Sequence, residues 1–113
     1  MSARIAYNPM DTVIDAFNAL YPAKECAVRW VPQVQGENNM GATHFADDGT
    51  ITVQIGFELP LGDAIETLGH ELAHVAAGYR AGHGKRWQAA FEALRLKYIE
   101  LSGAPEEQEK VTT

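Results

Sequence analysis

The sequence of 113 residues predicts one small α+β domain, in which a short antiparallel sheet packs against three helices. Two stretches alternate apolar and polar residues, as strands do, and an Asp-Gly pair precedes the second of them. Three further stretches place apolar residues at helical spacing. We expect the domain to span residues 1–103 and residues 104–113 to form a disordered acidic tail.

Composition favours a single compact unit in a reducing compartment. Hydrophobic residues make up 46% of the chain, which is enough for a modest core. The single cysteine, Cys26, excludes an intrachain disulfide and a four-cysteine zinc site, and we expect it to be buried and inert. No stretch approaches the roughly 18 apolar residues of a membrane span, so a cytoplasmic protein is expected. The net charge of -6 disfavours nonspecific binding to nucleic acid.

The first helix is predicted at "DTVIDAFNALYP", residues 11–22, with Asp11 as its N-cap and Pro22 closing the segment. Strands are predicted at "ECAVRWV", residues 25–31, and "ITVQIGF", residues 51–57. The Asp48-Gly49 turn signal predicts a hairpin that pairs residues 42–46 with residues 50–55. The segment from Val34 to Gly41 is expected to be a loop.

The second helix is predicted from a capping-box pattern, in which Glu66 follows Asp63 by three residues, and it continues to about Tyr79. Gly82 and Gly84 interrupt the helical pattern. A last helix is expected from about Lys85 until Gly103 and Pro105 end it. Its apolar stripe, expected to lie in the core, comprises Trp87, Phe91, Leu94, Tyr98 and Leu101.

The chemistry of the chain is concentrated in "HELAHVAAGYRAGHGKRW", residues 70–87. His70 and His74 project from the second helix on the side nearly opposite its apolar stripe. Residues four apart on a helix lie roughly 6 Å from each other, so both imidazoles can bind one zinc ion at about 2.0–2.1 Å. Glu71, between them in sequence, can reach a water bound to that zinc.

A catalytic zinc site usually has three protein ligands, and His83 is the preferred third. The flanking glycines, Gly82 and Gly84, permit a tight reversal that presents this one side chain. The competing ligands are carboxylates of the last helix, Glu92 first and Glu100 second. His44, in the hairpin, is expected to be an exposed or packing histidine.

His70, Glu71, His74 and the downstream "GHGKRW" resemble the SprT-like zinc metallopeptidases, over roughly residues 50–95. The resemblance implies a zincin-like fold with an active-site helix and a C-terminal helix. It also implies one zinc ion on His70, His74 and His83, with Glu71 as the general base for peptide-bond hydrolysis. The strand in "TITVQIGFEL", before the active-site helix, would be the edge on which a protein or peptide substrate pairs.

Two alternatives to a zinc endopeptidase remain open from the sequence. One is a zinc-containing SprT-like binding module without proteolysis, associated with nucleic-acid machinery. The other is a zinc hydrolase of a non-peptide amide. The DNA-repair branch of the family adds DNA-binding segments, and many members carry a C-terminal zinc ribbon. With one cysteine and an acidic balance, neither feature is visible here, so repair of DNA-protein crosslinks is not carried over to this chain.

Overall fold

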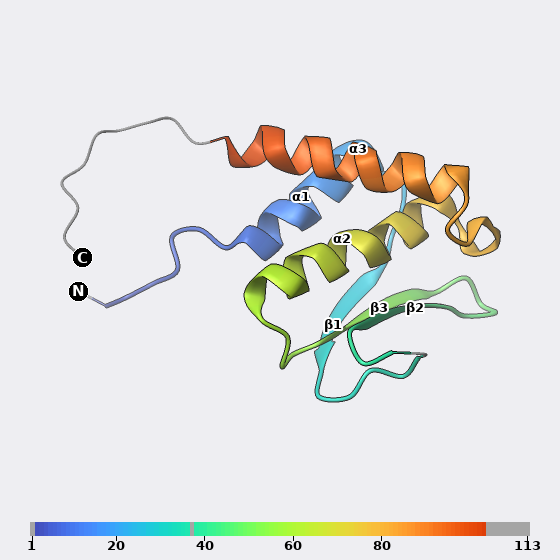
Figure 1. Cartoon of the computed structure of the whole chain (residues 1–113), viewed down its shortest axis with the longest axis horizontal. Helices are drawn as coiled ribbons and strands as arrows, with labels where there is room; N and C mark the ends of the chain where they lie inside the picture. Colours follow the sequence, from blue (N-terminus) through green and yellow to red (C-terminus); the bar gives the residue numbers. More distant parts are fainter. Residues whose placement is uncertain (1, 37, 104–113) are drawn as a thin grey trace.

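The computed structural model describes residues 2–36 and 38–103 and has the expected α+β class (Figure 1). The predicted acidic tail, residues 104–113, lies outside the described residues. The elements, in chain order, are α1 (Pro9–Leu20), β1 (Ala27–Val31), β2 (Gly41–Phe45), β3 (Ile51–Gly56), α2 (Leu61–Ala77), the 3-10 turn η1 (Tyr79–Ala81) and α3 (Lys85–Ser102). None of the helices in this described part is long and apolar enough to cross a membrane.

The sheet is mixed, with the strand order β1-β3-β2. The predicted hairpin is confirmed, because β2 pairs antiparallel with β3 and places Phe45 opposite Ile51. The prediction of an antiparallel sheet is wrong for β1, which runs parallel to β3 with Val28 opposite Val53. Alternation of apolar residues indicates which face of a strand is buried and carries no information on the direction of its neighbour.

The strand order also corrects the expected substrate edge. Residues 51–56 form the central strand, which is hydrogen-bonded on both sides, so they offer no free edge. The edges of this sheet are β1 and β2. Of these two strands, β2 is the one that packs directly against α2.

The helix α2 is the centre of the fold. One side of it packs on β2 and β3, and α1 and α3 pack on its other sides and on each other (Figure 1). The largest fully buried side chains come from β3 and α2: Val53, Ile55, Leu68, Leu72 and Val75. Each of them contributes roughly 1.5–3 kcal/mol when it leaves water. This burial fixes the rotation of α2, and with it the direction in which His70 and His74 project.

Two predicted helix starts are wrong by a few residues. The helix α1 begins at Pro9, and its N-cap is Asn8, whose side chain accepts a hydrogen bond from the backbone N–H of Met10. Asp11 lies in the first turn instead. The start of α2 at Leu61 has no side-chain cap, so Asp63 and its partner residue do not form a capping box. Proline fits the first helical position because it has no N–H to satisfy, which explains the early start of α1.

The end of α2 and the whole of α3 agree more closely with the sequence. The helix α2 ends at Ala77, two residues before the predicted end, because Gly78 has a φ of +96°. The helix α3 begins at Lys85 as predicted. Leu94 is buried in the core and Trp87 is partly buried against it, whereas Leu101 at the end of the predicted stripe is exposed.

Gly41 sets the distance between β2 and α2. A Cβ atom at Gly41 would lie 2.5 Å from Thr67 Cγ2 and 3.2 Å from Glu71 Cγ. Real Cβ atoms do not approach other atoms as closely as the first of these distances. The first residue of β2 must therefore be glycine if the strand is to lie this close to the functional face of α2.

We predict that Gly41→Ala destabilises the protein by about 1–3 kcal/mol, because the added methyl group overlaps Thr67. The matched control is Gly62→Ala in α2, where a Cβ atom would meet nothing within 4 Å. That substitution should be neutral or stabilise by up to about 1 kcal/mol, from helix propensity. Urea unfolding of both variants measures the difference. Equal stability of the two variants would contradict the close packing of β2 on α2.

Candidate metal centre

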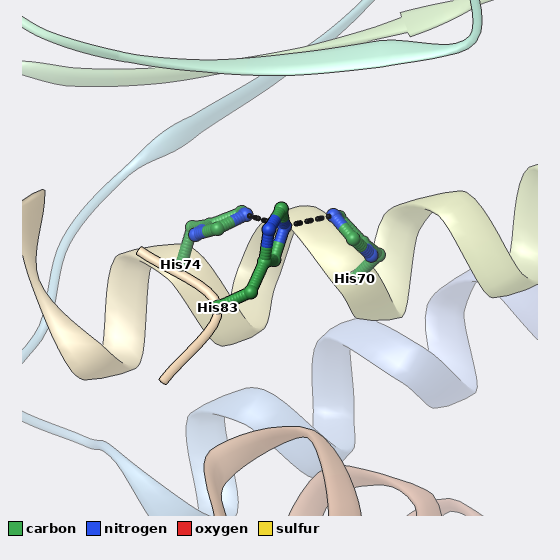
Figure 2. Close-up of side chains that lie close together, drawn as sticks. All are labelled: His70, His74 and His83. Carbon is green, nitrogen blue, oxygen red and sulfur yellow. Dashed lines mark hydrogen bonds between the residues drawn. The ribbon is translucent and has the colours of Figure 1, made fainter. Parts of the chain in front are cut away.

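Three histidine side chains converge on one point (Figure 2). The Nε2 atom of His83 lies 3.1 Å from Nε2 of His74 and 3.2 Å from Nε2 of His70. Zinc–nitrogen bonds of about 2.0–2.1 Å at tetrahedral angles separate two ligand nitrogens by about 3.3 Å. Both distances from His83 are therefore close to those of a tetrahedral metal site. Ligand atoms of all three side chains lie within 4.8 Å of one another, so the three side chains can hold a metal ion.

The donor chemistry of the cluster also fits a cation. The Nε2 atom of His83 is a donor when it carries a proton and an acceptor when it does not, so it cannot satisfy hydrogen bonds to both neighbouring imidazoles at once. A metal ion uses the lone pairs of all three nitrogens at once. Within the described residues, no other group of three or more histidine, cysteine or carboxylate side chains has this convergence.

The surroundings keep the imidazoles of α2 neutral. Burial, together with the nearby His70 and His83, lowers the pKa of His74 to about 4. Burial also lowers the pKa of His70, although the charge of Glu71 opposes this shift. A neutral imidazole is the form that binds a metal, so the pair on α2 is ready to act as ligands at neutral pH.

The third histidine is presented by a turn that only glycine readily forms. Gly82, directly before His83, has a φ of +54°, in the left-handed region. The side-chain amide of Gln88, one turn into α3, donates a hydrogen bond to the backbone carbonyl of His83 at 3.1 Å. The turn is thus fixed to the start of α3.

The competing carboxylate ligands are engaged elsewhere. Glu92 accepts two hydrogen bonds from Arg95, at 2.6 and 3.0 Å, and Glu100 pairs with Lys97 at 3.0 Å. Neither carboxylate belongs to the histidine cluster. Of the alternatives that the sequence left open, the geometry therefore favours His83.

Trp87 forms one wall of the cluster, which the sequence analysis did not foresee. Its ring centroid lies 4.8, 5.6 and 4.9 Å from those of His70, His74 and His83. Its indole N–H donates a hydrogen bond to the backbone carbonyl of His70 at 3.2 Å, and its ring stacks on Phe91. Trp87 packs on the core as expected, but it also orients the imidazoles. Its position four residues after His83, on the first turn of the next helix, is the signal that points to this contact.

The carboxylate of Glu71 lies beside the cluster and is held by β2. Glu71 is only 7% exposed, and its Oε1 atom accepts a hydrogen bond from the hydroxyl of Thr43 at 2.8 Å. Its Oε2 atom is 4.0 Å from Nε2 of His70. Thr43 was not identified from the sequence, because its role depends on how β2 packs on α2.

A cavity of about 230 Å³ lies between α2 and β2 and opens beside His70 and Glu71. We call it the α2–β2 cavity. Its lining residues are Asn38, Met40, Gly41, Asp63, Glu66, Thr67, His70 and Glu71. His70 and Glu71 therefore lie beside a cleft that a ligand can enter.

The other reactive side chains of the described residues lie outside this centre. Cys26 is half-buried in a larger cavity of about 850 Å³ between α1 and β1, which none of the three histidines lines. Burial raises the pKa of its thiol, so it stays protonated and inert at neutral pH. His44 lies on β2 and, as expected, does not belong to the histidine cluster.

Comparisons of the chain with protein-family models, with curated proteins and with solved structures found no match. The resemblance to SprT-like metallopeptidases therefore stays a prediction from the motif.

We predict that the protein binds one zinc ion and that His83→Ala lowers its zinc affinity by more than the roughly 10- to 100-fold loss seen when a residue only supports a ligand. The control is His44→Ala, which leaves the cluster intact. Competition with a chromophoric chelator measures both affinities. Zinc at about 100 times its Kd should also raise the free energy of unfolding by about 2.7 kcal/mol. Unchanged affinity in His83→Ala would assign the third ligand to another residue.

We also predict that acid destabilises the metal-free protein at a pH above the range where carboxylates titrate. The pKa of His74 is about 4 in the folded chain and roughly 6.5 when unfolded, so between these values only the unfolded state binds the proton. The free energy of unfolding should therefore fall as the pH drops from 7 to 5. His74→Gln should weaken this dependence in urea unfolding with a chelator present, and an identical slope would contradict the assigned pKa.

Proposed function

We propose that this protein is a zinc-dependent metallopeptidase that hydrolyses peptide bonds. The observation that carries the proposal is the convergence of His70, His74 and His83 beside the buried carboxylate of Glu71, at the mouth of a cavity. Metal-assisted hydrolysis needs a general base held next to the metal ligands. Here Glu71 lies on the same rigid helix as two of the three histidines, His70 and His74.

Each of these residues has a defined part in the proposed reaction. His70, His74 and His83 would hold the zinc ion, which would supply a Lewis acid for the substrate carbonyl and a bound water with a pKa lowered toward roughly 7. Glu71 accepts the proton of the attacking water and then delivers it to the leaving amine. The hydrogen bond from Thr43 holds one carboxylate oxygen, which leaves the other oxygen on the side of His70.

The sheet supports binding of an extended substrate. The strand β2 has one partner, β3, and its other edge faces away from the sheet. Its residue Thr43 contacts the general base directly. A peptide that pairs with the free edge of β2 would therefore lie along the histidine cluster, so we assign the substrate edge to β2. With a net charge of -6, a protein or peptide substrate is favoured over DNA.

We predict that Glu71→Gln lowers the rate of peptide hydrolysis by at least about 10²- to 10⁴-fold, because glutamine cannot accept the proton. Zinc content should be unchanged, since Glu71 is not one of the three converging ligands. Glu92→Gln, which alters an exposed carboxylate of α3 paired with Arg95, is the matched control and should keep full activity. Cleavage of a quenched-fluorescent peptide library measures the activity of the zinc-loaded wild type, Glu71→Gln and Glu92→Gln proteins.

Three outcomes would overturn parts of the proposal. Full activity of Glu71→Gln would exclude it as the general base. If the zinc-loaded wild type hydrolyses none of the peptides, a zinc-containing binding module becomes the better interpretation. If it instead releases the amine from simple non-peptide amides, the substrate class changes and the mechanism stays.

A further inference from the structure

We propose that the α2–β2 cavity binds the side chain of a lysine or arginine in the substrate, so that the enzyme cleaves next to basic residues. This inference rests on the proposed peptidase function. The cavity is lined by both His70 and Glu71, which are a metal ligand and the general base of that function. A side chain that fills it must therefore belong to a residue close to the bond being cleaved.

The cavity has a one-sided charge. Its lining includes three carboxylates, those of Asp63, Glu66 and Glu71, and no lysine or arginine among the residues that the structure describes. Asp63 and Glu66 form no ion pair within that part of the chain, whereas the other acidic residues with close basic partners, Glu92 and Glu100, lie on α3. Within the described residues, the carboxylates of Asp63 and Glu66 are therefore free to pair with a cation from outside.

The cavity also has a hydroxyl group that is open to a hydrogen bond from a ligand. Thr67 is only 7% exposed and lines the cavity, and its hydroxyl makes no side-chain hydrogen bond within residues 2–36 and 38–103. Asn38 lies opposite, with its Oδ1 atom fixed by the backbone N–H groups of Met40 and Gly41, at 2.8 and 3.1 Å. An ammonium or guanidinium group carries several N–H donors, so it can donate to the Thr67 oxygen and to the carboxylates of Asp63 and Glu66 together.

A second metal ion is a poorer occupant than an organic cation. Among the described side chains, only the three histidines place their ligand atoms within 4.8 Å of one another, so Asp63, Glu66 and Glu71 do not form a compact ligand set. They are instead distributed along the first three turns of α2. A charge on a long flexible stem, with donors pointing in several directions, matches this distribution better than a small divalent ion does.

The test compares two peptides that differ only at one side chain, lysine or its uncharged isostere norleucine, placed next to the scissile bond. Cleavage of the two peptides by the zinc-loaded full chain gives kcat/KM. Titration with peptides of the same sequence, in which the scissile peptide bond is reduced so that it cannot be hydrolysed, gives Kd. Lysine should be preferred by about fivefold or more, since each exposed ion pair contributes up to about a factor of five. The preference should decrease between 20 and 500 mM salt.

Variants identify the groups responsible. Asp63→Asn and Glu66→Gln, alone and combined, should bring the ratio of kcat/KM for the lysine peptide to kcat/KM for the norleucine peptide toward one. Glu66→Lys should invert this preference. Both side chains are exposed, so these changes leave the core unaltered. Glu92→Gln again serves as the control and should keep the wild-type ratio.

Failure of this inference and failure of the proposed function give different results. Cleavage without any preference for lysine, or a preference that survives the combined Asp63 and Glu66 variant, overturns the cavity assignment and leaves the peptidase standing. Absence of cleavage, together with tighter binding of the lysine peptide that these variants abolish, overturns the peptidase and supports the cavity as a cation-binding site. Equal binding of both peptides overturns the cavity in either case.

Discussion

The burial of α2 on several sides is the constraint on which the rest of the structure depends. Leu68 and Leu72 face the core at 0% and 1% exposure, and Ala73, on a different side of the helix, is also completely buried. A helix packed in this way cannot rotate without exposing large apolar side chains. His70 and His74 therefore keep fixed directions, and little conformational entropy is left for a metal ion to remove.

The third histidine of the cluster is positioned by a different physical route. His83 is exposed and belongs to no regular helix or strand. Its position follows from Gly82, whose positive φ turns the chain, and from α3, which holds the turn through Gln88 and closes the cluster with Trp87. The histidine cluster therefore joins two packed elements, and its geometry depends on the packing of α3 on α2.

The sequence predicted the parts of this site that are encoded locally. The spacing of His70, Glu71 and His74 places them on one helix, and the glycines around His83 indicate the turn, so these features were found without tertiary information. The contacts of Thr43 and Trp87 depend on which elements meet in space, and no local pattern encodes that. The same reason explains the error in the sheet, since the alternation in β1 is equally compatible with a parallel and an antiparallel neighbour.

The compact placement of the ligands in the chain has a consequence for how the protein folds. All three histidines fall within residues 70–83, whereas the pairing of β1 with β3 joins segments more than twenty positions apart. Closing the shorter chain segment costs less entropy, and contacts of low sequence separation form fastest. A metal ion bound by these histidines would therefore nucleate the α2–η1 corner ahead of the sheet, and an excess of metal during synthesis or refolding would favour chains in which that corner is already native.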